Sequence, residues 1–443
     1  MRDHSKHIEL TREEAVERML EASGFAVADR ALPVELVAIG ESFGRVLARD
    51  VVSAVDVPTC LTCSMDSIAV HWSDFANGMP DTSGRVRGVD WDFANTGVAM
   101  PEGFDTAIVV EHAVVSDDEQ HVSFDAAPSK QFAGTRQPGT RLKKGELLAR
   151  AGQLITPDLA SYIASGNIGV VPVVRKPRVM FIPTGNELVP PGAPDGDFHG
   201  RKAAVYARTI ESNSILVHGK VEQYGGIYSP MDIVPDDRDA IRAAIALACE
   251  TADIVVLNAG SSKGSDDWSC EVMEEMGEMI CHETNHGPGH HSSFAVVDGT
   301  PIVGISGPPT GATYTLDFYL RPLVRAYLGQ EPLLGKATAV LAAEFPQKKP
   351  HGHDHGKAKD AEPKKGSGCT AKGEQRPHME KRVFHKINLV HVVEDENGVL
   401  RATPVAGNPN ALGIDEANAI YLYPTGDEAV IPHVGDTIEI EYR

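Results

Sequence analysis

The strongest constraint on the fold is a pattern that repeats between residues 176 and 330. A short apolar run leads directly into a loop of small residues, and a helical segment follows. The apolar runs at residues 254–257 and 301–305 precede the loops GSSKG (260–264) and GPP (307–309). Repeated strand, glycine loop and helix are typical of a parallel α/β sheet, whose ligands bind beyond the carboxyl ends of the strands. We therefore expect an α/β domain here.

The residues before this region show a different pattern. Thr11 and Glu14 form a capping box that predicts a helix beginning at this point. Between residues 51 and 144, β-branched runs such as residues 51–57 alternate with Gly, Pro, Asp and Asn, as in short strands and turns. We expect an inserted β-domain at 51–144, within a helical linker domain formed by residues 1–50 and 145–175.

The last part, residues 331–443, reads as short strands separated by turns and predicts a small C-terminal β-domain. It is interrupted at residues 347–382, where almost no apolar residue occurs. This His- and Lys-rich segment cannot bury a core, and we expect a disordered insertion.

Charge narrows the possible partners. Lys and Arg number 41 against 62 Asp and Glu, so the formal net charge of the 443 residues is −21. The insertion carries eight Lys and two Arg against five acids, and removing it leaves −26 on the remaining chain. Such a body repels nucleic acid and acidic membrane surfaces. The polar N-terminus, the six cysteines and the lack of a long apolar run favour a cytoplasmic protein.

Four loops carry the residue types that bind phosphates and divalent cations. They are residues 64–67, 95–103, 183–187 and 260–267. Small residues let backbone N–H groups approach an anion, and neighbouring carboxylates can hold a hard cation that bridges to it. A phosphorylated ligand with Mg²⁺ is therefore one interpretation. The alternative is that Gly and Ser only form turns.

The same loops resemble the signatures of the MoeA / gephyrin E-domain family, the molybdopterin molybdotransferases. Six segments carry the resemblance in order along the chain: MDSIAV at 65–70, TGVAMPEGFD at 96–105, PTGNEL at 183–188, ESNS at 211–214, VPDD at 234–237 and GISGPP at 304–309. Residues 260–267 stand where that family has a further glycine- and serine-rich motif ending in Asp. The resemblance covers most of the chain apart from the insertion.

The resemblance implies a multi-domain α/β plus β architecture. Its parts are the helical linker domain, the inserted β-domain, a three-layer α/β molybdopterin-binding domain of MoCF type and a C-terminal domain like a β-barrel, in an elongated homodimer. The implied reaction inserts molybdate, or tungstate, into adenylylated molybdopterin with release of AMP and help from Mg²⁺. A MogA-like adenylyltransferase and an apo-molybdoenzyme are the further partners it suggests.

The resemblance also assigns site residues. Catalytic roles fall to Asp66, Thr96, Glu187, Asp236 and Asp267. Of these, Glu187, Asp236 and Asp267 would hold Mg²⁺. The substrate contacts would be Thr184, Gly185, Asn213, Gly260, Ser261, Ser262, Lys263, Gly264, Ser265, Gly307 and Pro309. In the family, the inserted domain reaches the α/β site of the partner subunit. For Asp236 a purely structural role, at the N-terminus of a helix, is equally open.

Some positions depart from the family pattern. Glu283, Gly287 and His290 stand where the family has lysines for the substrate phosphates, and Ser306 stands where it has proline. Either Lys263 replaces the lost charge or the ligand differs. A non-catalytic protein that binds or carries molybdopterin or the finished cofactor is therefore the alternative function. No sequence feature favours a third possibility, an interaction scaffold.

Histidines and cysteines offer further metal ligands. His282 and His286 are four residues apart and would share one face of a helix, although polar loop histidines are the simpler interpretation. Cys60 and Cys63 form a CxxC pair that is either redox-active, half of a zinc site or two free thiols. The histidines of the insertion at 351, 353 and 355 could bind a metal loosely.

Overall fold

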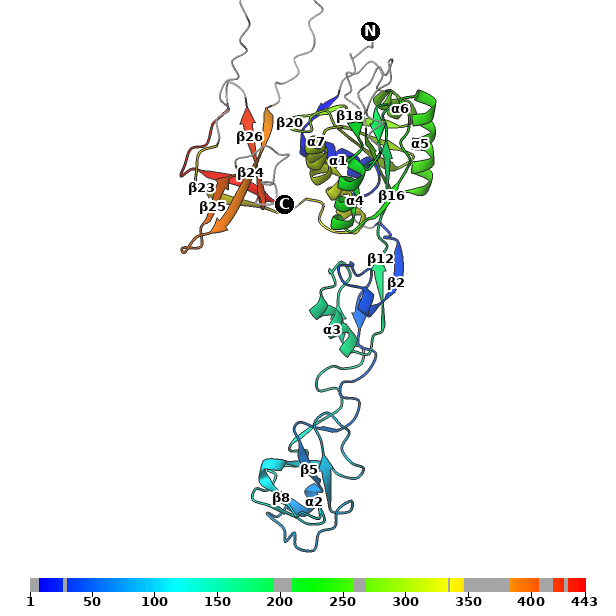
Figure 1. The fold of residues 1–443 in the computed structure, drawn as a ribbon. Helices are drawn as coiled ribbons and strands as arrows, with labels where there is room; N and C mark the ends of the chain where they lie inside the picture. The colour runs from blue at the N-terminus through cyan, green and yellow to red at the C-terminus, as the bar shows by residue number, and fades with distance from the viewer. Residues whose placement is uncertain are drawn as a thin grey trace, which may run out of the picture. The chain divides into compact units, whose positions relative to one another are not determined.

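The computed structural model describes residues 8–26, 30–193, 209–258, 268–333, 335–345, 383–405, 417–425 and 429–443. The chain divides into two compact units (Figure 1). We call residues 1–30 and 176–443 the core unit and residues 31–175 the inserted unit. The predicted domain boundaries after residues 50, 144 and 330 lie within these units and stay predictions. The predicted insertion at 347–382 lies outside the described residues.

The described part of the core unit contains several helical segments, and the first of them begins at the predicted capping box. They are α1 (Arg12–Ala22), α4 (Asn213–Tyr224), α5 (Arg238–Thr251), α6 (Ser269–Met276), α7 (Pro309–Thr315), η4 (Leu316–Leu320) and α8 (Arg321–Tyr327). The capping box of α1 is present, with the Thr11 side chain accepting from the Glu14 N–H. The helical segment that follows the loop at 307–309 consists of α7, η4 and α8, and η4 is a π-helical turn. Within the described ranges, no helix is long and apolar enough to span a membrane.

A mixed six-stranded sheet forms the centre of the core unit. Its order is β16 (Ile227–Pro230), β13 (Arg178–Pro183), β17 (Ile254–Asn258), β22 (Thr300–Ile305), β21 (Ser293–Val297) and β18 (Glu278–Cys281). The first four strands are parallel, as predicted. The last two pair antiparallel, so the prediction of a parallel sheet is wrong at this edge.

The change of direction has a local cause. Asp298 and Gly299 join β21 to β22 with φ of 49° and 80°. Two positive φ values in a two-residue loop are the signature of a type I′ hairpin, which pairs its strands antiparallel. The Asp-Gly pair between apolar runs is a sequence signal for this hairpin that our sequence analysis missed.

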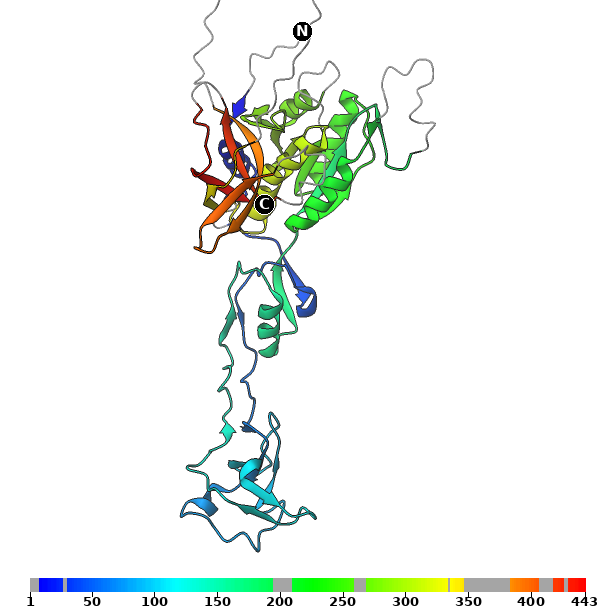
Figure 2. The same ribbon diagram turned by 60° about the vertical axis from the view of Figure 1, so that its left-hand side comes forward.

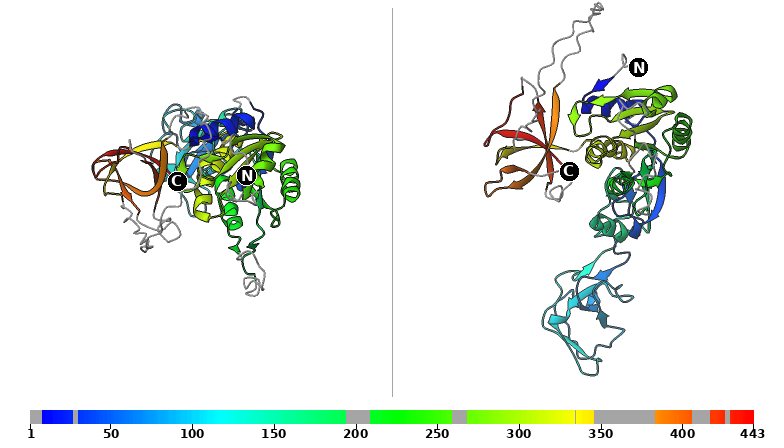
Figure 3. Two further views of the ribbon diagram at one scale, coloured as in Figure 1. Left: turned by 90° about the horizontal axis from the view of Figure 1, so that it is seen from above. Right: turned by 45° about the horizontal axis from the view of Figure 1, so that its top comes forward.

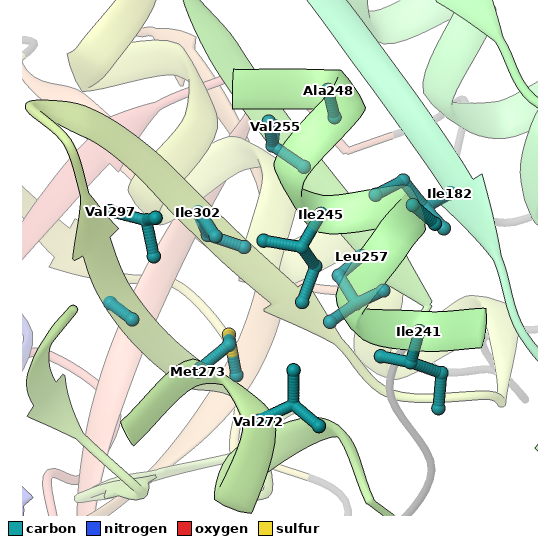
Figure 4. Packing of buried hydrophobic residues seen from close by; sticks show 12 residues of the cluster. Ile182, Ile241, Ile245, Ala248, Val255, Leu257, Val272, Met273, Val297 and Ile302 are labelled. Atoms are coloured by element: carbon teal, nitrogen blue, oxygen red, sulfur yellow. The ribbon is translucent and has the colours of Figure 1, made fainter. Parts of the chain in front are cut away.

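The apolar core of the sheet explains why these segments fold together. Ile245 of α5, Leu257 of β17 and Met273 of α6 are fully buried in one cluster (Figure 4). Complete burial of such a side chain contributes about 1.5–3 kcal/mol. The helices therefore hold the strands in place and fix the position of the loops beyond the strand ends.

The C-terminal strands close into a barrel, as predicted (Figure 3). The ring runs through β24 (Phe384–Glu394), β25 (Leu400–Pro404), β23 (Lys336–Leu341), β27 (Thr437–Tyr442) and β26 (Ala419–Thr425), which pairs with β24 again. Closure leaves no free edge within the ring. β24 also pairs with β20 (His286–Gly287), which joins the barrel to the α/β part. The remaining short strands of the core unit are β1 (Glu9–Leu10), β14 (Leu188–Val189), β15 (Thr209–Ile210) and β19 (Glu283–Thr284).

The inserted unit is rich in short strands (Figure 2). They are β2 (Val34–Ala38), β3 (Val51–Val52), β4 (Thr62–Cys63), β5 (Ser67–Val70), β6 (Trp91–Ala94), β7 (Thr106–Val109), β8 (Ala113–Val115), β9 (Val122–Phe124), β10 (Thr135–Arg136), β11 (Leu147–Ala149) and β12 (Val170–Val174), with the helical segments η1 (Ile39–Glu41), α2 (Trp72–Phe75), η2 (Val110–His112) and α3 (Pro157–Ser165). The predicted strand at 51–57 is wrong beyond residue 52. β5 lies between β6 and β7 and carries the fully buried Ile68 and Ala69.

Candidate functional site

The carboxyl ends of three neighbouring parallel strands are linked by hydrogen bonds around two buried asparagines, Asn213 and Asn258. Asn213, at the start of α4, donates from Nδ2 to Asn258 Oδ1 at 2.9 Å and to the Gly307 carbonyl at 3.0 Å. Thr184 Oγ1 donates to the Asn258 carbonyl at 2.6 Å. The structure therefore brings together three predicted substrate-binding residues, Thr184, Asn213 and Gly307, where α/β sheets bind ligands.

The hub residue Asn258 was missed by the sequence analysis. Its signal is a polar residue at the end of an apolar strand, and it is only 7% exposed. Asn213 Oδ1 is buried and accepts no hydrogen bond from any described residue. Buried acceptors are normally satisfied, so this atom is available to a donor on a ligand or a water.

The segment before α4 is fixed by Glu211. Its Oε1 accepts a hydrogen bond from the Ser214 N–H at 2.9 Å, and the residue is 5% exposed. The carboxylate takes up an N–H of the first helical turn, which is otherwise unpaired. Glu211 and Ser214 thus act together to hold Asn213 at the carboxyl ends of the strands.

The loop after β13 is held against the segment before α5. The Gly185 N–H donates to the Val234 carbonyl at 3.1 Å. The Asn186 N–H donates to Asp236 Oδ2 at 2.8 Å, and the Asp236 N–H donates back to Asn186 Oδ1 at 3.3 Å. Asp236 is therefore bonded to Asn186, the residue that precedes Glu187 in the loop.

Asp236 is not the residue that caps α5. The cap is Asp237, whose Oδ1 accepts from the N–H groups of Asp239 at 3.1 Å and Ala240 at 2.9 Å. The predicted structural role of Asp236, as the residue at the N-terminus of α5, is therefore wrong. Its carboxylate points instead to the loop of Glu187.

Gly185 is a position that requires glycine. Its φ is +149°, and a Cβ there would lie 2.8 Å from both Glu187 Oε2 and Leu188 Cγ. A side chain at this position would strain the backbone and push the Glu187 carboxylate away. Gly185 therefore lets the half-buried Glu187 fold back over the loop.

In the inserted unit, Asp66 and Thr96 lie side by side. Asp66 Oδ1 accepts a hydrogen bond from the Thr96 N–H at 2.7 Å, and both residues are exposed. The backbone and side-chain hydrogen bonds of Thr96 lower the pKa of Asp66 below its ordinary value. The pair is thus an exposed, ionised carboxylate held in a fixed orientation.

A cavity of about 440 Å³ lies beyond β22 in the core unit. It is lined by Pro288, Gly289, His290, His291, Ser306, Gly307, Pro308, Thr310 and Gly311. His290 is one of the three positions at which the family has a lysine and this chain does not. Glu283, another of them, accepts at Oε1 from His291 Nδ1, 3.1 Å away. At Gly287 a Cβ would lie 2.9 Å from the Phe384 ring, so a side chain there requires Phe384 to move.

The predicted helical pair His282 and His286 is wrong. His282 lies between β18 and β19, and His286 begins β20. His286 is 1% exposed, and its Nε2 lies 2.7 Å from the Tyr319 hydroxyl. His282 Nε2 lies 2.5 Å from Glu274 Oε1. The two rings have separate partners, and each belongs to the packing of its own strand end.

The two cysteines of the CxxC pair lie in different environments. Cys60 is exposed, whereas Cys63 is buried in β4, and both are free thiols. Burial raises the pKa of Cys63. Since the thiolate is the reactive form, Cys63 is a poor nucleophile and metal ligand here.

Several predicted site residues lie outside the described residues. They are Gly260, Ser261, Ser262, Lys263, Gly264, Ser265 and Asp267. Pro309, the first residue of α7, is described and adjoins the cavity at Pro308. Within the described ranges, no group of three or more His, Cys, Asp or Glu is arranged to hold a metal ion.

Comparisons with known proteins agree with this arrangement. A domain family described as the MoeA N-terminal region (domain I and II) matches residues 10–166, and one described as a probable molybdopterin binding domain matches residues 180–326. The molybdopterin molybdenumtransferase of Haemophilus influenzae is 26% identical over 333 residues, which cover 73% of this chain and 78% of that protein. The enzyme of the same name from Bacillus subtilis is 26% identical over 340 residues, covering 71% and 76%.

The fold has a solved counterpart. The molybdopterin biosynthesis MoeA protein of Pyrococcus horikoshii superposes with a TM-score of 0.69 at 21% identity, covering 98% of this chain and 99% of that one. This likeness concerns the fold, including the C-terminal barrel. The two family matches and the relatives named molybdopterin molybdenumtransferase confirm the predicted family, enzyme class and pathway. The chain belongs to the MoeA family of molybdenum cofactor biosynthesis.

Proposed function

We propose that the chain inserts molybdate into adenylylated molybdopterin, releasing AMP, with help from Mg²⁺. The observation that carries the proposal is the hydrogen-bond network of Asn213 and Asn258 that links three strand ends, with Glu187 and Asp236 on the adjoining loops. In a member of this family, that edge is the place for a phosphorylated pterin. The relatives named above carry the name of this activity.

The donors beside the strand ends fit Mg²⁺. Mg²⁺ keeps several waters and is bound through one or two carboxylates together with substrate phosphates. Glu187 and Asp236 supply two carboxylates on loops tied by the Asn186–Asp236 hydrogen bonds, and Asp267 is the third ligand of the proposal. When bound, the ion would neutralise charge on the phosphates of the substrate.

The protein's own groups would position the substrate. The amide of Asn213 offers its unpaired Oδ1 to a donor on the substrate. The exposed backbone at Gly307 leaves the edge open to a large ligand. The residues of loop 260–265 complete the proposed set of contacts through their N–H and hydroxyl groups.

We further propose that the site is completed in a homodimer, with Asp66 and Thr96 supplied by one subunit and Glu187 by the other. The Asp66–Thr96 hydrogen bond supports this, because it orients an ionised carboxylate on the surface of the inserted unit, where it can meet another molecule. Mixing inactive Asp66→Ala and Glu187→Gln proteins tests it. Random exchange of subunits would restore about a quarter of the wild-type activity, whereas sites built within one subunit would restore none.

The activity is tested with the full chain, adenylylated molybdopterin, Mg²⁺ and molybdate, with tungstate in parallel. We expect release of AMP and a product that reconstitutes an apo-molybdoenzyme. Omission of Mg²⁺ should abolish release, and calorimetry should show Mg²⁺ binding that Glu187→Gln weakens. No AMP and no cofactor from the wild-type protein would refute the enzyme.

One observation favours the second candidate, a carrier of molybdopterin or of the finished cofactor. The lysine positions hold Glu283, Gly287 and His290, and the Phe384 ring occupies the space beside Gly287. A carrier would bind the pterin tightly without turnover. Its affinity would be unchanged by Asp267→Ala, which would abolish the reaction of an enzyme.

A further inference from the structure

A second cavity, of about 180 Å³, lies where α1, η4 and α8 meet the barrel strands β23 and β27. Its lining contains five charged residues and is otherwise apolar. The charged residues are Arg12, Asp317, Arg321, Lys336 and Glu441. The cavity is smaller than the roughly 300–1,000 Å³ of sites for drug-sized molecules. Its size therefore suits an ion or a compound of a few non-hydrogen atoms.

This cavity is separate from the strand ends that carry the proposed substrate site. The helical segment that begins with Pro309, beyond β22, extends as far as Tyr327. The Tyr327 hydroxyl lies 3.0 Å from Asp253 Oδ1, immediately before β17 begins. The segment thus runs from the carboxyl ends of the strands back to their amino ends. Asp317 and Arg321 lie about two and three helical turns along it.

Both carboxylates of the cavity already have cationic partners. Glu441 accepts hydrogen bonds from the two terminal nitrogens of Arg12, at 2.5 and 2.8 Å. Asp317 Oδ1 accepts from Lys220 Nζ at 2.6 Å, and its Oδ2 lies 3.9 Å from Arg443 Nη2. The protein itself therefore offsets both negative charges, and neither requires a cation in the cavity.

Two guanidinium groups keep donors that no described residue takes up. Arg321 is half-buried and makes no hydrogen bond or ion pair with a described residue; its central carbon lies 6.0 Å from the centre of the Tyr224 ring. Arg12 is 5% exposed, and its Nε is buried without a described hydrogen-bond partner. A buried donor without an acceptor is costly, and a ligand that accepts hydrogen bonds would remove this cost.

Lys336 adds a third positive charge to the lining. Its ammonium lies 2.8 Å from Glu439 Oε1, but the two side chains are 44% and 60% exposed. An exposed pair of this kind is weak, so Glu439 offsets the charge of Lys336 only in part. The apolar part of the lining excludes water, which strengthens the attraction between these cations and an anion.

We infer that this cavity binds a small tetrahedral dianion of the phosphate and sulfate class, with the Arg321 guanidinium as its main contact and Arg12 Nε and Lys336 as further donors. The planar fork of a guanidinium matches two oxygens of such an anion. Because α1, α8 and two barrel strands form the cavity, the anion would also bind the barrel to the α/β part. The inference does not depend on the proposed function.

The test is calorimetry of inorganic phosphate with the full chain, at constant ionic strength and after Mg²⁺ has been removed on a chelating resin. Without Mg²⁺, Glu187 and Asp236 repel an anion from the strand ends. We expect one phosphate per chain. Arg321→Gln should weaken binding by about 10-fold or more, the usual effect of losing a charge-assisted hydrogen bond. Lys336→Gln should weaken it by about 2- to 10-fold.

Arg325→Gln is the matched control. Arg325 is a half-buried arginine of the same helix, its Nε donates to the Glu331 carbonyl at 2.6 Å, and it does not line the cavity. Its replacement should keep the affinity within about 2-fold. Arg12→Lys keeps a positive charge opposite Glu441 but removes Nε, and should weaken phosphate by about 2- to 10-fold. Circular dichroism and urea unfolding check that each variant is folded.

Phosphate binding that is weakened by Arg321→Gln and kept by Arg325→Gln supports the inference. Sulfate and molybdate, titrated in the same way, then identify the source of the anion. Equal binding of all three indicates a general site for tetrahedral dianions, and a preference for molybdate indicates a site for the substrate anion. No saturable binding of any of the three, equal affinity in wild type and Arg321→Gln, or equal displacement by chloride would overturn the inference.

Discussion

Two regions carry the predicted polar residues, and they differ in how those residues are held. At the sheet edge of the core unit, Asn213 and Asn258 are buried and bonded to three strand ends. In the inserted unit, Asp66 and Thr96 are exposed and bonded to each other across a loop. In the first region the polar groups therefore also stabilise the fold. In the second region they can be replaced without a loss of stability.

This difference has a consequence for mutagenesis. Removing a buried partner leaves other groups unsatisfied, which costs about 1–3 kcal/mol for each. Removing an exposed partner lets water take its place, with little effect on folding. Changes at the sheet edge should thus affect stability and activity together, and changes at Asp66 should affect activity alone.

The largest expected effect concerns Glu187. Glu187→Gln removes one of the proposed Mg²⁺ carboxylates with almost no change in size, and we expect cofactor formation to fall by about 100-fold or more. The measurement is the rate of AMP release at saturating Mg²⁺. Asp237→Ala is the control, because it should cost about 1 kcal/mol of stability as a lost helix cap while the rate is retained. A normal rate in Glu187→Gln would show that this carboxylate holds no essential metal.

The next prediction concerns the buried amide of Asn213 at the strand ends of the core unit. Asn213→Ala leaves Asn258 Oδ1 and the Gly307 carbonyl without their donor. We expect the free energy of unfolding in urea to fall by about 1–3 kcal/mol, together with a loss of activity. Asn388→Ala, which removes a single hydrogen bond to the Lys386 carbonyl in the barrel, should change stability by less than about 1 kcal/mol. Equal effects of the two variants would contradict a special role for the strand-end hub.

A further prediction concerns a buried group of the core unit and the dependence of stability on pH. Burial, with the charge of Arg12 second, lowers the pKa of His286 to about 3. The unfolded ring titrates near pH 6.5, so between about pH 3 and 6.5 the unfolded chain binds a proton that the folded ring does not. Stability should therefore fall as the pH drops below about 6.5, by up to about 1.4 kcal/mol per unit from this residue.

The check is the pH dependence of urea unfolding in wild type and His286→Gln. The variant should lose this part of the slope, even if its stability at pH 7 is lower through the altered contact with Tyr319. A slope unchanged by His286→Gln would contradict a neutral, buried ring.

The smallest effect on stability is expected at the exposed pair, Asp66 and Thr96. Thr96→Val removes the hydroxyl that contributes to the low pKa of Asp66, and we expect that pKa to rise toward its ordinary value. Carboxyl NMR titration measures it directly. A depressed carboxylate pKa contributes stability above the ordinary value near pH 4, and the contribution is lost as the pH falls through the folded pKa. At this exposed site the change in stability should be undetectable.

A matched carboxylate in the same unit provides the comparison. Asp81 is also exposed, and its Oδ1 accepts from the Ser83 N–H at 3.0 Å, which lowers its pKa as well. Asp81→Ala should leave cofactor formation unchanged, whereas Asp66→Ala should reduce it without a change in stability. If both variants reduced activity equally, the effect would belong to the surface charge of the unit, not to Asp66.

Much of the fold followed from local signals in the sequence. The capping box of α1 and the strands β17 and β22 were predicted close to their observed positions. Such features depend on a few neighbouring residues, through caps, β-branched runs and positive φ. The Asp298-Gly299 hairpin is an equally local signal. Because our sequence analysis missed it, the direction of β21 relative to β22 was predicted wrongly.

The candidate site was predictable in its residues but not in its contacts. The sequence by itself determined that small and acidic residues follow the apolar strands. Only the tertiary structure decided that Asp237 caps α5 while Asp236 bonds to Asn186, that Asn258 joins the strand ends, and that the barrel closes on β24. The physical reason is that hydrogen-bond partners and burial arise between segments far apart in the chain, where packing chooses among side chains that are equally polar.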